Sequence, residues 1–296
     1  MNKVIVITGP TAVGKTKLSV ELAKKLNGEV INADSMQIYK GLNIGTAKIL
    51  ESEKEGIVHH LFDIKNVDEE YSIYNYQIDA RKIIDDIIKR GKTPIMVGGT
   101  GLYIKACLYD YKLSENKFRS DFEDMTNEEI YSYLCSKLGN IEIDKNNRRR
   151  LVSALNYYNE TGKAINENKT DKLLYDAIFI GLTCDRNILY DRINKRVDAM
   201  INNGLLDEVK YFYDKNIRTK PLLGGIGYQE IYKYLDGVYD LKTAIEEIKK
   251  NSRHYAKRQY TFFNHQLNIK WFSVNFEDFN ITINEVLDFI RDNDNW

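Results

Sequence analysis

The sequence predicts an α/β fold in which a parallel β-sheet is flanked by helices and interrupted by a helical insertion. Short apolar runs of strand length alternate with segments of helical periodicity along most of the chain. The first run passes directly into a glycine-containing loop and then into a helix, the order of a phosphate-binding βα unit. Residues 112–175 are instead polar and helical in pattern, with no strand expected before Ala177. We therefore expect an α/β core formed by residues 1–111 and 176–296 and a helical insertion domain at 112–175.

The expected elements follow in order from these patterns. The strands are short apolar runs whose C-terminal ends should share one edge of the sheet: Val4–Ile7, Glu29–Ala33, Pro94–Val97, Ala177–Leu182 and Ile269–Phe272. The core helices carry apolar residues at helical spacing, as in Ile73–Lys89, Leu189–Met200 and a last amphipathic helix with Val286, Leu287 and Ile290. In the insertion, Thr126–Glu129 has the pattern of a capping box, and Leu151–Tyr158 should form a helix that ends at Gly162.

The composition is that of an ordinary soluble globular protein, with 43% hydrophobic and 29% charged residues in 296. Lys plus Arg and Asp plus Glu both number 43, so any site for a polyanion must come from local clustering. The three cysteines (Cys107, Cys135 and Cys184) lie far apart, which argues against a zinc site or a disulfide framework and fits a reducing cytosol. No signal peptide or membrane-spanning run is evident, so we expect a cytoplasmic protein that does not associate with membranes.

The most specific motif is Gly9-Pro-Thr-Ala-Val-Gly-Lys-Thr16, the pattern of a P-loop between a strand and a helix. Its glycines allow a tight turn in which successive backbone N–H groups point at phosphate oxygens. Lys15 would supply a cation for the terminal phosphate, and the Thr16 hydroxyl is placed to ligate Mg²⁺. The motif predicts a ligand with two or more linked phosphates but does not identify the reaction.

Two further strand ends should lie at the same edge of the sheet as the P-loop. The second strand ends at Asp34, whose carboxylate could ligate Mg²⁺, act as a general base or cap a helix. The third strand ends at Gly98-Gly-Thr100, where a backbone could approach an anion closely or form an ordinary tight turn. His59 and His60 are adjacent and point in different directions, so a metal site there is not expected.

Three basic stretches have two interpretations each, a polyanion-binding face or a solvated surface. Arg148–Arg150 open a helix, where the helix dipole disfavours cations unless they face an external polyanion. Arg192–Arg196 lie on a helix that could close over phosphates. Lys249–Tyr260 carries five cations and no acid, interleaved with aromatic residues, which is typical of a nucleic-acid face.

These residues leave three reaction classes open. A small-molecule kinase would use the P-loop for ATP. A nucleotide-hydrolysing switch would need an Asp after an apolar strand, and none is obvious because the third strand ends in Gly-Gly-Thr. A transferase with an organic diphosphate donor needs the phosphate cradle but no adenine pocket.

Seven segments, in order over nearly the whole chain, closely resemble motifs of the bacterial tRNA dimethylallyltransferase family. They are Gly9–Thr16, Asp34–Tyr39, Asn43–Lys48, Gly98–Tyr103, Arg192–Gly204, Ile226–Tyr228 and Tyr255–Gln259. The resemblance implies a P-loop kinase-like core with a helical insertion, with tRNA between the two. It also implies transfer of a dimethylallyl group from dimethylallyl diphosphate to N6 of the adenosine 3′-adjacent to the anticodon, with Mg²⁺ as cofactor and a monomeric enzyme. A small-molecule or nucleoside kinase that uses ATP is the alternative.

The resemblance also implies roles for residues. Asp34 would be the general base, Thr100 would hydrogen-bond the reacting region or the leaving diphosphate, and Lys15 would stabilise that diphosphate. The residues expected to bind the diphosphate are Gly9, Pro10, Thr11, Ala12, Val13, Gly14, Lys15 and Thr16, with Thr16 also a ligand of Mg²⁺. The residues expected to contact tRNA are Asp34, Ser35, Met36, Gln37, Thr100, Arg119, Arg149, Arg150, Leu151, Val152, Ser153, Lys257 and Arg258.

The chain departs from the family pattern in the insertion. Ser153 and Asn156 stand where the family usually has Arg and Glu, so one tRNA contact would be lost or taken over by the preceding arginines. The insertion and its arginine run argue against a related group that prenylates free adenine nucleotides.

Overall fold

The computed structural model describes residues 3–111, 113, 122, 124–164 and 169–293. The chain divides into two compact units, which are described separately below. The core unit comprises residues 1–108 and 175–296, and the insertion unit comprises residues 109–174.

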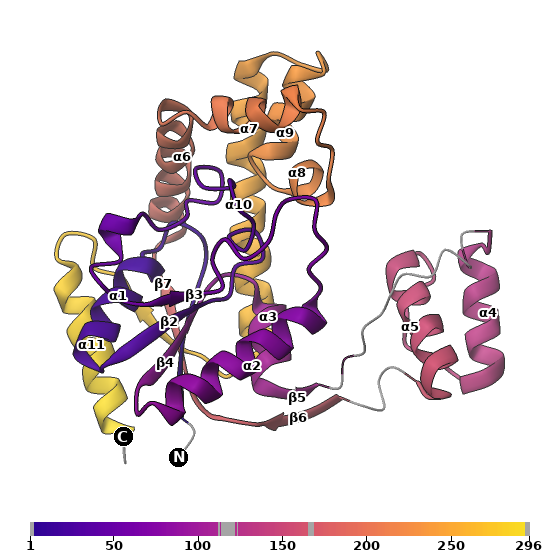
Figure 1. Cartoon of the computed structure of the whole chain (residues 1–296), viewed down its shortest axis with the longest axis horizontal. Helices are drawn as coiled ribbons and strands as arrows, with labels where there is room; N and C mark the ends of the chain where they lie inside the picture. The colour runs from indigo at the N-terminus through magenta and orange to yellow at the C-terminus, as the bar shows by residue number, and fades with distance from the viewer. Residues whose placement is uncertain (1–2, 112, 114–121, 123, 165–168, 294–296) are drawn as a thin grey trace. The chain divides into compact units, whose positions relative to one another are not determined.

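Six parallel strands form the sheet of the core unit, in the spatial order β3-β2-β4-β1-β7-β8 (Figure 1). They are β1 Lys3–Thr8, β2 Gly28–Asn32, β3 His59–His60, β4 Thr93–Val97, β7 Asp176–Thr183 and β8 Lys270–Ser273. The inner strands are rich in Val and Ile and are buried on both faces, as parallel sheets require. The expected α/β fold with a parallel sheet flanked by helices is confirmed, although two-residue β3 was too short to be predicted.

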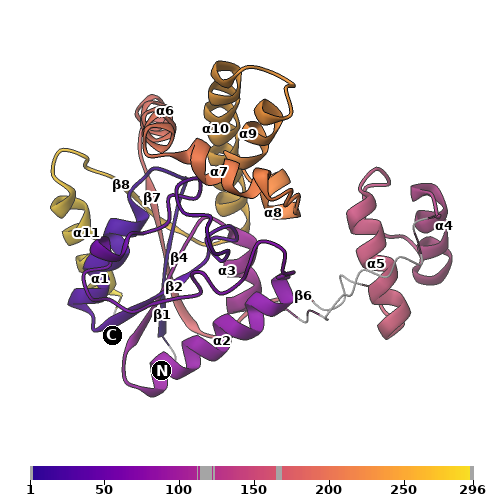
Figure 2. The same cartoon turned by 45° about the horizontal axis from the view of Figure 1, so that its top comes forward.

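Alternate residues of β1 face opposite sides of the sheet. Ile5 and Ile7 pack with residues of α1 (Lys15–Lys25) and α11 (Phe279–Asp292) in one core cluster. Figure 2 shows these two helices side by side against the sheet. On the other side, α2 (Ile73–Lys89) packs against β2 and β4 and against α3 (Gly101–Leu108). The result is a three-layer arrangement that leaves the C-terminal ends of the strands accessible to loops.

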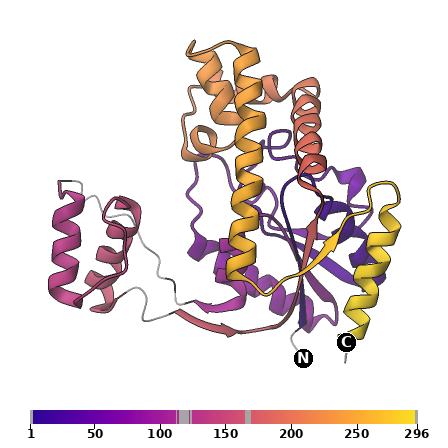
Figure 3. The same ribbon diagram turned by 180° about the vertical axis from the view of Figure 1, so that it is seen from behind.

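Five helices that follow β7 form a second core cluster within the core unit. They are α6 Arg186–Asn202, α7 Leu205–Asp214, α8 Lys220–Gly224, α9 Tyr228–Leu235 and α10 Leu241–Gln266. The 26-residue α10 extends alongside α6 (Figure 3). Tyr39 and Leu42 pack into the same cluster. They belong to residues 34–48, called here the Asp34 loop, which is therefore anchored on these helices; the Glu51–Glu53 3₁₀ turn lies just beyond the loop.

The insertion unit contains an antiparallel strand pair and two helices. The elements are β5 Tyr109–Tyr111, α4 Asn127–Leu138, α5 Arg148–Thr161 and β6 Lys169–Leu173. The capping box at Thr126 and the left-handed Gly162 that ends α5 are confirmed. The expectation of no strand before Ala177 was wrong, because β6 reads Lys-Thr-Asp-Lys-Leu and has no apolar run that would mark a strand. Among the helices described, none is both long and apolar enough to cross a membrane.

Candidate active site

The C-terminal ends of β1, β2 and β4 bring the predicted site residues together in the core unit. Two cavities lie at this edge, of about 720 Å³ and about 300 Å³. Residues 11–17 of the P-loop and the first turn of α1 line the larger cavity, whereas Ser35, Met36 and residues 224–228 line the smaller one. The residues shared by both cavities are Thr11, Asp34, Thr46, Arg196 and Tyr255.

Glycine at the start of the P-loop is required by two independent constraints. Gly9 has a φ of +135°, a conformation that residues with a Cβ rarely adopt. A Cβ at this position would lie 2.5 Å from the carbonyl oxygen of Leu182 in β7. The loop can therefore pass close to β7 and reach α1, where Lys15 and Thr16 occupy the first turn.

The Lys15 ammonium lies under the P-loop backbone. Its Nζ donates hydrogen bonds to the carbonyl oxygens of Gly9, at 3.0 Å, and Pro10, at 2.6 Å. Burial lowers the pKa of Lys15 to about 7, with a further lowering by the Arg196 cation and an opposing effect of the Asp34 carboxylate. A diphosphate bound in this cavity would favour the charged ammonium, so the cation is best stabilised when the anion is present.

Two arginines of α6 contact the P-loop and line the larger cavity. Arg192 Nε donates to the Ala12 carbonyl oxygen at 3.0 Å, and Arg196 donates to the Thr11 hydroxyl at 3.2 Å. Burial lowers the pKa of Arg196. This face of α6 is therefore packed against the P-loop and is not simply solvated. The four-residue spacing of the arginines, which places them on one helical face, was the available sequence signal.

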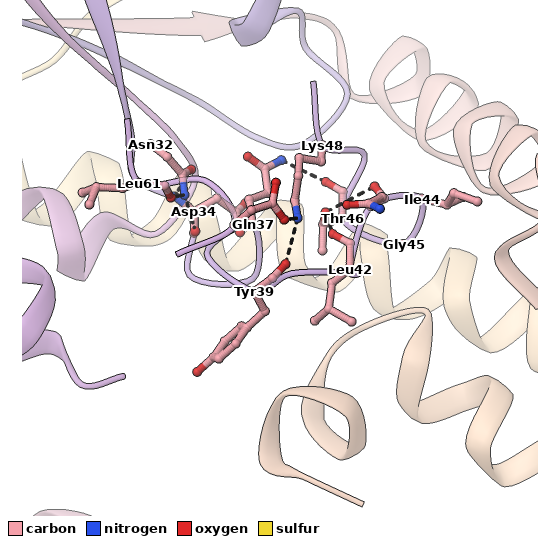
Figure 4. A network of polar contacts seen from close by, with 12 residues as sticks. Asn32, Asp34, Gln37, Tyr39, Leu42, Ile44, Gly45, Thr46, Lys48 and Leu61 are labelled. Atoms are coloured by element: carbon pink, nitrogen blue, oxygen red, sulfur yellow. Dashed lines mark hydrogen bonds and ion pairs between the residues drawn. The ribbon is translucent and has the colours of Figure 1, made fainter. Parts of the chain in front are cut away.

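Asp34 is held in a tight turn after β2 (Figure 4). Its Oδ1 accepts the Met36 N–H at 2.9 Å, and its own N–H donates to Asn32 Oδ1 at 2.8 Å. The turn is not followed by a helix, so the helix-cap interpretation is wrong. Within the described chain, Oδ2 has no hydrogen-bond partner, and Asp34 is the one carboxylate that lines both cavities. An available carboxylate oxygen at the junction of two cavities suits a general base.

Thr100 supports the Asp34 turn from the end of β4. Its Oγ1 accepts the Ser35 N–H at 3.1 Å, and its N–H donates to the Ala33 carbonyl oxygen at 3.0 Å. Neither cavity has Thr100 in its lining. The hydroxyl expected to contact a bound anion is thus engaged with the neighbouring turn, because the backbone after β4 turns towards β2.

The remainder of the Asp34 loop is fixed by Gln37 and by Glu208, the second of which the sequence did not single out. Gln37 Nε2 donates to the Thr46 carbonyl oxygen at 3.0 Å (Figure 4). The Glu208 carboxylate of α7 accepts the N–H groups of residues 43–45 at 2.7–3.1 Å, and the Tyr228 hydroxyl donates to it at 2.6 Å. No local pattern marked Glu208, because the loop that it binds lies more than 160 residues earlier in the chain.

The candidate tRNA-binding residues of α5 have different environments. Arg149 and Arg150 are exposed, and Ser153 is half-buried. Leu151 and Val152 are 0% and 4% exposed and belong to the core cluster of the insertion unit, so their side chains do not offer the expected contacts. The periodicity of α5 turns these two residues inward. Arg119 lies outside the described residues.

Arg148 has a structural role at the start of α5. Its guanidinium donates to the carbonyl oxygens of Met125, at 2.6 Å, and Phe122, at 2.9 Å. These bonds to main-chain carbonyls explain a cation at a helix N-terminus without an external polyanion. Neither interpretation of this basic run, a polyanion-binding face or a solvated surface, describes Arg148.

The positive charge of the basic stretch of α10 is partly neutralised by acidic residues outside that stretch. Lys249 pairs with Asp198 of α6, and Lys250 pairs with Glu247. Lys257 and Arg258 are exposed, and Arg258 also lines the smaller cavity and lies 5.6 Å from the centre of the Tyr255 ring. The cationic face available to a polyanion is therefore narrower than the sequence indicated.

The donor set around the P-loop fits Mg²⁺ bound together with a phosphate ligand. In the part of the chain that is described, no group of three or more His, Cys, Asp and Glu side chains could hold a metal by itself. The Thr16 side chain lines the larger cavity beside Lys15. Mg²⁺ is commonly held by one or two protein oxygens plus substrate phosphates and water, which a lone hydroxyl in a phosphate cavity can satisfy.

Comparisons with known proteins identify the family of this chain. A family model described as IPP transferase matches residues 37–266. A tRNA dimethylallyltransferase from Anoxybacillus flavithermus is 49% identical over 299 residues, covering 98% of this chain and 96% of the relative. One from Bacillus subtilis is 47% identical over 284 residues, covering 92% and 90%.

Solved structures give the same result. A tRNA isopentenylpyrophosphate transferase from Bacillus halodurans superposes with a TM-score of 0.78 at 42% identity, covering 98% of this chain and 96% of that one. A eukaryotic dimethylallyltransferase acting on tRNA has a TM-score of 0.83 at 34% identity, covering 92% of this chain and 73% of that one. The family resemblance inferred from the motifs is confirmed: the chain belongs to the IPP transferase family.

Proposed function

We propose that this chain is a tRNA dimethylallyltransferase, which transfers a dimethylallyl group from dimethylallyl diphosphate to N6 of the adenosine 3′-adjacent to the anticodon. The family membership supports the reaction class. The observation that carries the assignment of residues is the position of Asp34, whose carboxylate lines both a phosphate-binding cavity and a second, smaller cavity.

The larger cavity would bind the prenyl donor through its diphosphate. Cleavage of the allylic C–O bond places negative charge on the departing diphosphate. Lys15, Arg192 and Arg196 surround the P-loop and would stabilise that charge as it develops. Thr16 would hold Mg²⁺, which when bound neutralises charge on the phosphate oxygens.

The smaller cavity would receive the adenine of the acceptor. It is lined by apolar and aromatic side chains, including Met36 and Tyr255, with Arg258 at its wall. A base must leave its stack to enter such a cavity, at a cost of a few kcal/mol. Aromatic stacking and phosphate contacts offset costs of this size. Asp34, between the two cavities, would accept the proton from N6 as the new C–N bond forms.

An ATP-dependent kinase activity has less support than prenyl transfer to tRNA. The family model and the relatives compared above are named as transferases of an isopentenyl or dimethylallyl group. The exocyclic amine of adenine is a weak nucleophile, so its attack requires a general base. The Asp34 carboxylate, which lines the same cavity as the P-loop, could serve as that base.

The exposed cations would contact the RNA. Arg149 and Arg150 in the insertion unit and Lys257 in the core unit present their charge to solvent. We infer that they bind the phosphates of an anticodon stem-loop, that the enzyme acts as a monomer and that it works in the cytoplasm with its tRNA. Sedimentation of the protein with and without tRNA tests the monomer assignment.

The decisive experiment is incubation of the purified protein and Mg²⁺ with dimethylallyl diphosphate and an unmodified anticodon stem-loop. We expect mass spectrometry to find one added five-carbon group on the adenosine next to the anticodon. A stem-loop with guanosine at that position is the matched control and should stay unmodified. Phosphate transfer from ATP to a small molecule, with no prenyl donor consumed, would contradict the proposal.

A further inference from the structure

A single buried amide joins the two halves of the site. Gln259 of α10 is 4% exposed and lines the larger cavity. Its Oε1 accepts the Thr11 N–H at 3.0 Å, and its Nε2 donates to the Gly99 carbonyl oxygen at 3.1 Å. The P-loop and the turn after β4 are therefore connected through one side chain from a helix far along the chain.

The connection requires glycine at position 99. A Cβ on Gly99 would lie 2.0 Å from Gln259 Nε2, closer than any real contact allows. Tyr255, one turn earlier on α10, lines both cavities, and its hydroxyl would lie 4.0 Å from a Cβ on Gly99. One face of α10 therefore presents two side chains to the turn that supports Asp34.

The Gln259 contact also limits which amides can bind an anion. Pro10 has no N–H, and the N–H of Thr11 is directed at Gln259. The N–H groups of the P-loop that are available for a diphosphate therefore begin at Ala12. An apolar residue at 259 would leave a buried N–H and a buried carbonyl oxygen without their partner, which disfavours the observed separation of the two segments.

We propose that Gln259 is a positioning residue that sets the distance between the diphosphate-binding loop and the general base. The path runs from Thr11 through the Gln259 amide to Gly99, then through the adjacent Thr100 hydroxyl to the Ser35 N–H beside Asp34. This inference rests on the proposed function. Reaction rates depend steeply on such distances, since a misplacement of about 1 Å costs about 100-fold.

Two variants disrupt the hydrogen bonds of the amide to different extents. Gln259→Leu removes both hydrogen bonds, and Gln259→Glu keeps an acceptor for Thr11 N–H but removes the donor to Gly99. We expect both to lower kcat by about 10- to 100-fold at saturating donor and stem-loop, with stem-loop affinity unchanged. Retention of the fold is checked by circular dichroism, and Gln259→Glu serves if Gln259→Leu does not fold.

Gln77→Leu is the matched control that shows whether a loss of stability alone lowers kcat. Gln77 is also buried, at 5% exposed, and its Nε2 donates to the Ala106 carbonyl oxygen at 2.7 Å, but it lines neither cavity. We expect this variant to lower the melting temperature while kcat stays at the wild-type value. An equal loss of kcat in Gln77→Leu and Gln259→Leu would overturn the positioning role.

A double-mutant cycle with Thr100→Val tests the path. If Gln259 acts through Thr100, the double variant should lose much less than the product of the two single losses in kcat. Losses that multiply, or a Gln259→Leu kcat equal to wild type, would refute the inference. Since wild-type turnover is measured in the same series, an inactive wild type would refute the proposed function instead.

Discussion

Asp34 shows how one side chain can serve both local structure and chemistry. Oδ1 is used by the turn, whereas Oδ2 has no partner among the described residues. We predict that Asp34→Asn, which keeps an acceptor for the Met36 N–H, lowers the single-turnover rate of prenyl transfer by about 10²- to 10⁴-fold. Stem-loop affinity, measured by filter binding, should be retained.

Glu53→Gln is the control for Asp34→Asn. Glu53 is a carboxylate on the wall of the larger cavity that does not reach the smaller one. We expect its variant to turn over like the wild type. Wild-type turnover in Asp34→Asn would remove that residue from the role of base.

Lys15 should contribute chiefly to the affinity for the prenyl donor. Burial lowers the pKa of its ammonium, and the charge of a bound diphosphate would compensate for the lost hydration. We predict that Lys15→Met weakens donor binding by about 10- to 100-fold, the range for a charge-assisted hydrogen bond. Calorimetric titration with dimethylallyl diphosphate measures this, with Lys24→Met on the same helix as the control, because Lys24 lines neither cavity. An unchanged donor affinity in Lys15→Met would contradict the role of Lys15 in binding the diphosphate.

At the scale of elements, the start of α5 separates structural from RNA-binding cations. Arg148 is bonded to main-chain carbonyls, whereas Arg149 and Arg150 are exposed. We predict that Arg149→Ala and Arg150→Ala each reduce the slope of log affinity against log salt by about 1, because each removes one phosphate contact. Thermal stability should not change in either variant.

Arg148→Ala should behave in the opposite way, with a lower melting temperature of the protein. Lys137→Ala, on α4, reports the effect of removing an exposed cation elsewhere in the insertion unit. A salt slope equal to wild type after both Arg149 and Arg150 are removed would show that α5 does not contact the RNA backbone.

At the level of overall stability, the relevant feature is an ion cluster centred on Glu29 of β2. The Glu29 carboxylate, 2% exposed, is hydrogen-bonded to Arg90, Lys92 and His60. Arg90 has the largest effect, and together these partners hold the pKa of Glu29 well below its ordinary value of 4.5. A carboxyl with a depressed pKa contributes stability above its unfolded-state pKa and loses it as the pH falls towards the folded-state value.

We therefore predict that Glu29→Gln lowers the free energy of unfolding at pH 7 by roughly 1–3 kcal/mol, as expected for lost charged hydrogen bonds. The difference from wild type should shrink as the pH falls below about 4.5, where the unfolded wild type takes up a proton. Urea denaturation at pH 7 and at successively lower pH measures both values. A difference that stays constant with pH would show that Glu29 stabilises the fold by packing and not by charge.

Features of the fold that depend on neighbouring residues could be predicted from the order of the residues. The strand, loop and helix of the P-loop, the position of Asp34 at a strand end and the bounds of α2 all follow from local backbone preferences and hydrophobic period. The family resemblance came from the same local motifs. Five of the six strands of the main sheet were predicted for this reason, and β3 and β6 were not, because neither has an apolar run.

Contacts between side chains far apart in the chain could not be predicted in this way. Gln259 reaches Thr11 across 248 positions, and Glu208 reaches the Asp34 loop across more than 160. The inward orientation of Leu151, the internal bonds of Arg148 and the pairing of Lys249 with Asp198 likewise depend on how elements pack. The physical reason is that backbone conformation responds to residues a few positions away, whereas burial and charge pairing depend on surfaces brought together by the whole fold.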